Sequence, residues 1–300
     1  MNRYMSQEKR VWIGHLTATN AAEAMRRALE HATVRTDPKL VAIKINICDY
    51  RRPESGATTD PSILGALLRV LRHRHPSSRL VLVENDATTL DIGVAYRLLG
   101  FDSVAADHGA ELHNMAMGAW AVRPVPDGRV LKELEVPAIL DECDVFINFA
   151  KLKTNALTKT TGCLKNIFAF YRAKRKVMLH GTIDDVLHDM NKVIRPDVCL
   201  IDGYIGQEGM GPAFGRPKRC ELLIAGTNPV AVDACEARVM GFRPRSVRHI
   251  RLCAEAGLGP IDYELETDIP QFQYNRYHFE FPHFEYHLRN ALRTRAGIAT

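Results

Sequence analysis

The pattern of apolar and polar positions predicts strands that alternate with helices. Residues 41–47 (VAIKINI) alternate strictly, which places the aliphatic side chains on one face of a strand and Lys44 and Asn46 on the other. Short apolar runs of the same kind predict further strands at 80–84, 144–149, 198–202 and 221–226. A lysine inside an apolar strand must be paired or line a site, so Lys44 is a first candidate for chemistry.

Helical spacing of apolar residues fills the gaps between these strands. Asp60 and Pro61 are typical of a helix start, and Asn228-Pro229 is a second signal of the same type. Helices are also predicted at 92–99, 160–170, 183–194 and 244–256. This alternation is typical of crossover units, so we predict an α/β protein with mostly parallel sheets and flanking helices.

A shift in composition near residue 145, where a long acid-free stretch begins, predicts a domain boundary. Residues 1–144 would form an N-terminal α/β lobe with an insertion near 101–143. Residues 145–265 would form a second α/β lobe that carries the site segments. Residues 266–300 are rich in aromatic residues and histidine, and we predict an extension that packs on the body or joins two subunits in a homo-oligomer.

The overall composition is that of a globular protein in the cytoplasm. The chain has 300 residues, 46% of them hydrophobic and 25% charged, and neither a secretory signal nor an apolar run that could span a membrane is expected. Its seven cysteines are odd in number and contain no CxxC pair, which favours reduced thiols over an iron–sulfur cluster or structural zinc. A net charge of +5 is too modest to indicate nucleic-acid binding by itself.

The segment 151–166 (KLKTNALTKTTGCLKN) carries the strongest local signal. It follows a predicted buried strand, and no Asp or Glu occurs between Asp144 and Asp184. Ammonium groups beside the amides of a helix start bind phosphate or carboxylate, so we predict a small-anion site. A solvated basic face and a nucleic-acid patch are the alternatives. The predicted binding residues are Lys44, Asn46, Lys151, Lys153, Thr154, Thr161, Gly162, Lys165, Asn166, Gly209 and Gly211.

A glycine-rich segment, 202–215, supplies the candidate acids and bases. Its five glycines permit a tightly folded loop near a ligand, although an ordinary flexible loop would have the same composition. Asp202 and Glu208 could move a proton or bind a divalent metal, and His180 is a third catalytic candidate. Glu84, at the end of its strand, joins Asp202 and Glu208 as a candidate metal ligand. The sequence leaves the identity of any cofactor open.

The order of these motifs resembles one family of proteins, the uncharacterised domain of unknown function three-six-two. The motifs are KxN (44–46), TTDP (58–61), Glu84, KLKT (151–154), GCLKN (162–166), His180, DG (202–203), EGxGP (208–212) and NPVAVDA (228–234). The resemblance covers roughly residues 40–260. Many members of this family carry an iron–sulfur ferredoxin segment, and this chain lacks the cysteines for one.

A more distant likeness is to the N-terminal domain of the nickel-pincer lactate racemase. It rests on the turn DYRRP (49–53) after an early strand, and on Gly162 and Lys165 after a later one. This likeness implies a two-lobed α/β protein with its site in the cleft between the lobes. The paired cofactor histidines of that family are not evident in this sequence.

We therefore predict an enzyme that binds a small anionic metabolite through its carboxylate or phosphate. Isomerisation, epimerisation or elimination by acid–base chemistry would suit the candidate residues, with or without help from a divalent metal. A non-catalytic protein that binds a small anion or cofactor is the alternative hypothesis. A nucleic-acid binder is the third, and the modest net charge argues against it.

Overall fold

The structure, a computed structural model, describes residues 9–32, 37–173 and 176–281 of the chain. The strands in this part of the chain are β1 (Arg10–His15), β2 (Leu40–Lys44), β3 (Arg79–Glu84), β4 (Ala110–Asn114), β5 (Trp120–Pro124), β6 (Glu133–Pro137), β7 (Val145–Asn155), β8 (Lys159–Thr160), β9 (Val198–Met210), β10 (Phe214–Gly226) and β11 (Glu264–Thr267). All except β5 and β6 belong to one sheet, ordered β11-β1-β10-β9-β7-β2-β3-β4, with β8 paired to β7.

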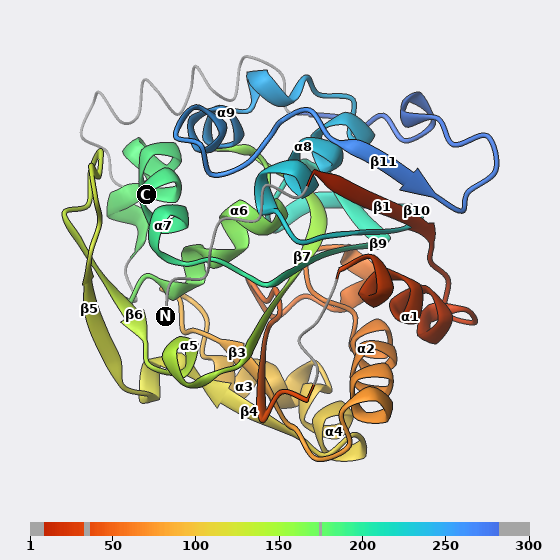
Figure 1. The fold of residues 1–300 in the computed structure, drawn as a ribbon, viewed down its shortest axis with the longest axis horizontal. Coiled ribbons are helices and arrows are strands. Elements are labelled where there is room, and N and C mark those ends of the chain that lie inside the picture. The colour runs from red at the N-terminus through yellow and green to blue at the C-terminus, as the bar shows by residue number, and fades with distance from the viewer. Residues whose placement is uncertain (1–8, 33–36, 174–175, 282–300) are drawn as a thin grey trace.

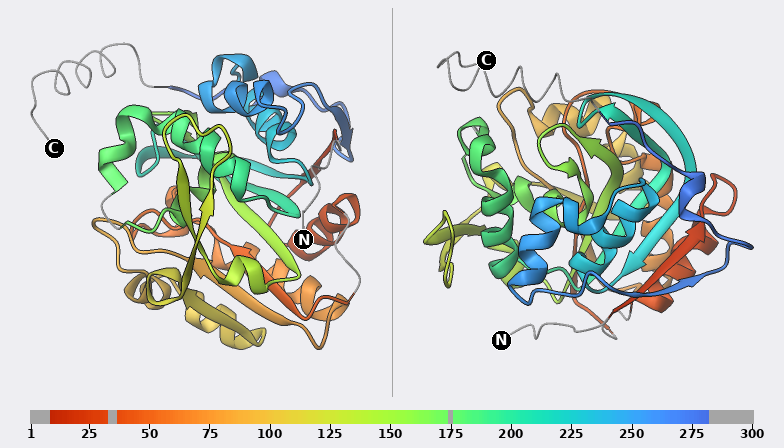
Figure 2. Two further views of the ribbon diagram at one scale, coloured as in Figure 1. Left: turned by 60° about the vertical axis from the view of Figure 1, so that its left-hand side comes forward. Right: turned by 90° about the horizontal axis from the view of Figure 1, so that it is seen from above.

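Helices cover both faces of this sheet. The described helices are α1 (Ala21–His31), α2 (Pro61–Arg74), α3 (Ile92–Leu98), α4 (Phe101–Asp107), α5 (Ile139–Glu142), α6 (Gly162–Asn166), α7 (Ile183–Val193), α8 (Pro229–Val239) and α9 (Arg248–Glu255). Figure 1 shows α1 and α2 on one side of the sheet and α6 and α8 on the other. The views in Figure 2 show the same layering of helices around the sheet.

The two faces of β7 pack into separate parts of the core. Val145, Ile147 and Phe149 point to the α1 and α2 side, where they are buried with apolar residues of those helices. Phe146, from the opposite face, packs with the α7 side instead. Burial on both faces is typical of a parallel sheet covered by helices, and the observed fold confirms the prediction of an α/β protein.

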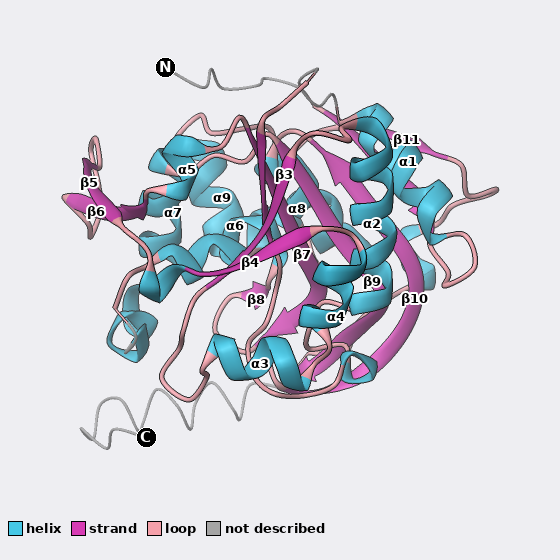
Figure 3. Cartoon of the chain, turned by 90° about the horizontal axis from the view of Figure 1, so that it is seen from below, coloured by secondary structure: helices cyan, strands magenta, loops and turns pink. Residues whose placement is uncertain are grey.

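The central pairs β7–β9, β7–β2, β2–β3 and β3–β4 are all parallel. Strands from both sides of the predicted boundary at residue 145 pair directly, because β7 lies next to β2. The division into lobes of residues 1–144 and 145–265 stays a prediction. The segment 101–143 contains α4, β4, α5 and the separate β5–β6 ribbon, which stands out from the body in Figures 1 and 3.

The glycine-rich segment is a pair of strands, and the predicted tightly folded loop is limited to the turn between them. Strands β9 and β10 pair antiparallel, from Cys199 opposite Gly226 to Met210 opposite Phe214. Figure 3 shows the two strands curving together. Glycine is needed here because backbone runs very close by. A Cβ atom on Gly211 would lie 1.9 Å from the carbonyl oxygen of Thr154. A Cβ atom on Gly215 or Gly206, within the strands, would also lie 2.4 Å from the Glu208 carbonyl oxygen or 2.8 Å from that of Leu152, so these glycines allow close packing of strands.

Two other predictions concern membrane-spanning segments and the C-terminal extension. Among the described residues, no helix combines the length and apolar character needed to cross a bilayer. The extension predicted for 266–300 is only partly described, since residues 282–300 lie outside the described ranges. The part that is described places Tyr277 and Phe279 in the core beside β10.

Candidate functional site

A cavity of about 270 Å³ opens at the carboxyl ends of β2, β3 and β7. Four lysines line it, Lys44, Lys153, Lys165 and Lys176, together with one carboxylate, Glu84. The carboxyl ends of parallel strands are the usual place for a ligand in an open α/β sheet. The excess of cationic over anionic side chains makes the cavity electropositive.

Lys44 is fully enclosed at one end of a polar network. Its Nζ donates to Glu84 Oε1, to the carbonyl oxygen of Ile45 and, at 3.2 Å, to Asn166 Oδ1. Burial lowers the pKa of Lys44, and the carboxylate of Glu84 opposes that shift. The three acceptors match the three protons of an ammonium group, so Lys44 fixes the surrounding side chains and has no free proton for a ligand.

Lys153 occupies the other end of the same network. Its Nζ donates to Asn46 Oδ1 at 2.7 Å, to the Ala57 carbonyl oxygen at 2.5 Å and to Cys48 Sγ at 3.4 Å. None of these partners is a carboxylate. The positive charge of Lys153 is therefore hydrogen bonded without being neutralised by a directly bonded acid.

Asn166 joins these two lysine clusters. Its Oδ1 accepts from Asn46 Nδ2 at 2.8 Å as well as from Lys44, and its Nδ2 donates to Asn148 Oδ1 at 2.7 Å. Asn46 is itself held by a hydrogen bond from its backbone N–H to Thr59 Oγ1 at 2.8 Å. The network thus connects residues far apart in the chain and sets the shape of the cavity floor.

Helix α6, which carries Lys165 and Asn166, is anchored by two buried acids of α8. Asp233 accepts from the amides of Cys163 at 2.7 Å and Leu164 at 2.8 Å, and Glu236 accepts from that of Gly162 at 3.2 Å. Burial raises the pKa of Asp233 to about 8, and burial with the nearby charge of Asp233 raises that of Glu236. Gly162 has a φ of 55°, and a Cβ there would lie 2.4 Å from the Asp233 carboxylate.

Lys165 and Lys176 are the cations best placed to meet a ligand. Burial, followed by the charge of Lys153, lowers the pKa of Lys165 to about 8. Burial also lowers the pKa of Lys176 to about 8, against the attraction of Glu84. No hydrogen bond or ion pair from the described residues reaches Lys165 Nζ, whose recorded contact is with the Phe168 ring, 5.8 Å to the centroid. His180 is a further lining residue, and partial burial and the charge of Lys165 lower its pKa.

Two further side chains of the cavity have an oxygen atom without a hydrogen-bond partner in the described part of the chain. They are Thr161, through Oγ1, and Asn85, through Oδ1. Their residues are only 2% and 3% exposed. Buried polar atoms are almost always hydrogen bonded in folded proteins, so these two atoms indicate that something else satisfies them.

Other predicted residues lie apart from the cavity lining. Lys151 and Asp202 form a buried ion pair at 2.6 Å, with both side chains 0% exposed. Glu208 accepts from Lys218 Nζ at 2.9 Å and from the Glu280 amide at 3.0 Å. Burial opposes the lowering of the Glu208 pKa, but these two hydrogen bonds and the charges of Lys218 and Arg216 together outweigh it.

The remaining predicted residues support the β9–β10 hairpin. Thr154 Oγ1 donates to the carbonyl oxygen of Gly209 at 2.9 Å, and the Gly209 amide donates to Glu280. Gly211 supplies the carbonyl oxygen that accepts from the Ala156 amide. The structure thus brings together Lys44, Asn46, Lys153, Thr161, Lys165, Asn166, Glu84 and His180, and it places Lys151, Thr154, Gly162, Asp202, Glu208, Gly209 and Gly211 outside the lining.

The three candidate metal ligands are separated from one another. Glu84 binds Lys44, Asp202 binds Lys151 and Glu208 binds Lys218. Across the described ranges, no group of three or more His, Cys, Asp or Glu side chains is close enough to hold a metal ion. The cavity residues are mostly donors, which suit an anion better than a cation.

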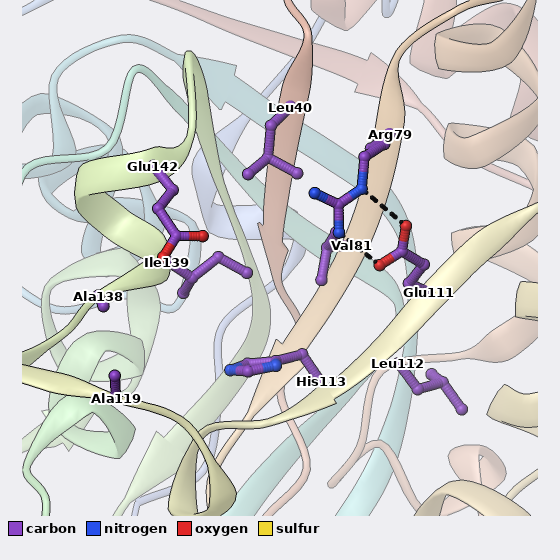
Figure 4. Close-up of a pocket in the computed structure, with 10 residues that line it drawn as sticks. All are labelled: Leu40, Arg79, Val81, Glu111, Leu112, His113, Ala119, Ala138, Ile139 and Glu142. Atoms are coloured by element: carbon purple, nitrogen blue, oxygen red, sulfur yellow. Dashed lines mark hydrogen bonds and ion pairs between the residues drawn. The ribbon is translucent and has the colours of Figure 1, made fainter.

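A second cavity, of about 260 Å³, lies between the β3–β4 edge of the sheet and α5 (Figure 4). The guanidinium group of Arg79 donates to the Glu111 carboxylate, from Nε at 3.0 Å and from Nη2 at 2.8 Å. Burial lowers the pKa of His113, while Glu142 and Glu111 oppose this shift. Because its charges are largely paired, this cavity offers a weaker case for an anion site.

Several polar residues of the lining were absent from the predicted set of site residues, among them Cys48, Asn85 and Lys176. Asn85 directly follows the predicted strand that ends at Glu84, so the strand-end rule would have found it. Lys176 lies in the acid-free stretch and shared its signal. Nothing in the sequence distinguishes Cys48 from the other cysteines, because its place beside Lys153 depends on the fold.

These features define an α/β protein whose parallel strands end at a lysine-lined polar cavity. Residues 41–238 match the family described as domain of unknown function (DUF362), and the chain belongs to that family. The resemblance predicted from the motifs is confirmed. All of the cavity side chains discussed above lie within the matched residues.

Two individual proteins are also similar to this chain. A thylakoid-associated protein from Synechocystis sp. is 32% identical over 132 residues, which are 41% of each chain, so the chain spans less than half of that relative. The lactate racemase apoprotein from Thermoanaerobacterium thermosaccharolyticum has a TM-score of 0.38 and 12% identity, over 85% of this chain and 58% of its own. At that identity and score, the likeness says nothing about activity, metal or cofactor.

Proposed function

We propose that the protein is an enzyme that binds a small anionic metabolite in the lysine-lined cavity and moves a proton on it. The observation that carries this proposal is Lys165, an ammonium group in a cavity without an acid partner among the described residues. An unpaired cation in a desolvated site is costly unless a ligand compensates it. A carboxylate or phosphate would supply that compensation.

The size of the cavity limits the ligand to a small molecule. The volume of about 270 Å³ lies just below the usual range for ligand pockets, about 300–1,000 Å³. Lys165, Lys176 and the Thr161 hydroxyl would donate to the anion, while Asn85 Oδ1 would accept from a hydroxyl or amine elsewhere on it. This arrangement would orient an anion that carries a second polar group.

Proton transfer is assigned to Lys165 and His180 in this proposal. An amine with a pKa of about 8 can act as acid or base near neutral pH. His180, with its lowered pKa, would be neutral there and able to accept a proton. Asp202 and Glu208 are not assigned this step, because each is held by a lysine outside the cavity lining.

The first test measures binding. Calorimetry with inorganic phosphate and with small hydroxy- and dicarboxylates should detect binding by the wild-type protein and a loss in Lys165→Met. Lys159→Met is the matched control, since Lys159 belongs to the same lysine-rich segment but its Nζ donates to Ser246 at 2.9 Å. Equal binding by all three proteins would contradict the assignment of the site.

The second test distinguishes an enzyme from a binding protein. Carboxylates that bind are incubated with the protein in deuterium oxide, and NMR follows exchange of their carbon-bound protons. Wild-type protein should exchange the proton next to the carboxylate, while Lys165→Met and His180→Gln should not. Binding without exchange for any ligand would favour the alternative, a non-catalytic anion-binding protein.

A further inference from the structure

Cys48 differs from the other cysteines in its surroundings. It lines the lysine-lined cavity and is partly exposed, while the other six, Cys143, Cys163, Cys199, Cys220, Cys235 and Cys253, are buried. Within the described residues it is thus the cysteine that a small molecule in the cavity could reach. The Cys48 thiol also lies within weak donating range of two carbonyl oxygens, that of Pro212 at 3.5 Å and that of Ala57 at 3.6 Å.

The sulfur atom is in contact with a cation. Lys153 Nζ lies 3.4 Å from Cys48 Sγ, and its other two protons are directed to Asn46 Oδ1 and the Ala57 carbonyl oxygen. The third ammonium proton is therefore available to the sulfur. An ammonium that donates to sulfur stabilises the thiolate, which is the nucleophilic form of cysteine.

Independent features of the same cavity indicate that a ligand binds next to this thiol. Thr161 Oγ1 and Asn85 Oδ1 are more than nine-tenths buried and have no hydrogen-bond partner in the described structure. Lys165 adds an ammonium group that no described acid neutralises. An anionic ligand that satisfies these groups would occupy the cavity that Cys48 lines.

We infer that Cys48 is a nucleophilic thiol of this site, directed at small carbon electrophiles that carry a carboxylate. The inference rests on the proposed function, because the lysines of the cavity would hold that carboxylate. With an α,β-unsaturated carboxylate, the sulfur bonds to the β-carbon and the π electrons move to the α-carbon, which takes up one proton. The thiol proton lost and the carbon proton gained balance, so the addition needs no other reactant and its reversal is an elimination.

The test is a comparison of two alkylating reagents on the full-length protein. In both, the sulfur displaces iodide, which leaves with the electrons of the carbon–iodine bond, while the thiol proton passes to the buffer. Neutral iodoacetamide is normally the faster reagent with a free thiol. At Cys48, anionic iodoacetate should react faster than iodoacetamide. Its rate with the wild-type protein should be at least tenfold higher than with Lys153→Met, and inorganic phosphate should slow the reaction. Peptide mass spectrometry identifies the labelled cysteine.

Three variants make the result specific. Cys48→Ser should lose the rapid labelling, and Lys159→Met should retain it. If Lys153→Met does not fold, Lys165→Met replaces it, because that side chain makes no hydrogen bond to the described residues. A Cys48 that is unreactive, or that shows no preference for iodoacetate, overturns the inference.

Phosphate calorimetry on the same samples tells the two proposals apart. If phosphate binds but Cys48 lacks the preference, the inference about the thiol fails and the anion site stands. If phosphate and the carboxylates do not bind and Cys48 shows no preference, the proposed function fails together with the inference.

Discussion

Lys151 and Lys153 stand two residues apart on β7, and both side chains are buried, yet they differ in how their charge is balanced. Lys151 pairs with a carboxylate, Asp202, at 2.6 Å, and both partners are fully enclosed. Lys153 donates to an amide oxygen, a carbonyl oxygen and a sulfur, and it faces a cavity. The pairing of β7 with β9 is irregular between these two residues.

This difference separates a lysine that supports the fold from a lysine that serves a site. A buried ion pair is balanced inside the protein, and it needs no further partner. A buried ammonium that has no carboxylate partner keeps a charge that an anionic ligand can help to neutralise. The comparison predicts that replacing Lys151 costs stability and leaves anion binding unchanged, whereas replacing Lys153 costs less stability and weakens binding.

The largest effect is expected for Lys151→Met. It would leave the Asp202 carboxylate buried without its partner, and such losses cost about 3–5 kcal/mol of unfolding free energy. Urea denaturation measures this loss. Anion binding by the protein that remains folded should be unchanged. In the double variant Lys151→Met/Asp202→Leu, much of the lost stability should return. A double variant as unstable as Lys151→Met alone would contradict the explanation.

Lys153→Met should combine a smaller loss of stability with a loss of binding. It leaves Asn46 Oδ1 and the Ala57 carbonyl oxygen without their donor, which costs about 1–3 kcal/mol. The affinity for phosphate or a carboxylate should fall about tenfold, equal to ~1.4 kcal/mol. Calorimetry and denaturation on the same sample test both numbers. Unchanged affinity would remove Lys153 from the site.

The pH dependence of binding and of stability should have opposite signs. Lys165 and Lys176 have pKa values of about 8, so anion affinity should decrease severalfold as pH rises through about 8 and the ammonium groups lose their protons. For stability, these pKa values lie below those of the unfolded chain, about 10.4 for lysine. The unfolded state therefore holds more protons between about pH 8 and 10, and these two lysines make the folded protein more stable as pH rises through that window.

Lys165→Met isolates its share of this dependence. In this variant, anion affinity should fall less steeply with rising pH than in wild type, and the unfolding free energy should rise less steeply. The difference between the two slopes measures the share of Lys165. Titrations at pH 7, 8 and 9, with denaturation at the same values, provide it. Wild-type affinity that increases with pH would contradict the role given to these ammonium groups.

The smallest effect is expected for Glu208→Gln. Glu208 holds Lys218 and the Glu280 amide outside the cavity lining, so its loss should cost about 1 kcal/mol or less. Anion affinity and any proton exchange should remain within about twofold of wild type. A strong loss of either would return Glu208 to the list of catalytic candidates.

Much of the fold and part of the site could be predicted from the sequence. Alternation over 41–47 and the strand ending at Glu84 placed Lys44, Asn46 and Glu84 at neighbouring strand ends, where the cavity is found. The helix start at Pro61 was also correct, since Asp60 accepts from the Ser62 amide. These signals are local, and local periodicity was enough to find them.

The remaining features depend on pairing between distant segments. Lys151 and Lys153 lie in the same short segment, KLKT, and the sequence does not tell them apart. Only the position of Asp202 on β9 separates their roles. The glycines of 202–215 indicated a loop, because composition does not show that a neighbouring strand approaches within contact distance. The anchoring role of Asp233 also depends on distant residues, since its partners on α6 lie 70 and 69 residues earlier.

The attachment of α6 to α8 also has a consequence for the order in which the protein can be completed during synthesis. Lys44, Glu84, Lys153 and Lys165 are all made before Asp233, whose carboxylate holds the first turn of α6. A growing chain that has just exposed α6 therefore carries Lys44, Lys153 and Lys165 without the acids of α8 that fix this helix. Contacts between such distant residues form slowly because a long loop must close first. The α6 side of the cavity should thus take shape only after α8 is made, and a chain that stops before α8 should hold Lys165 in no fixed position.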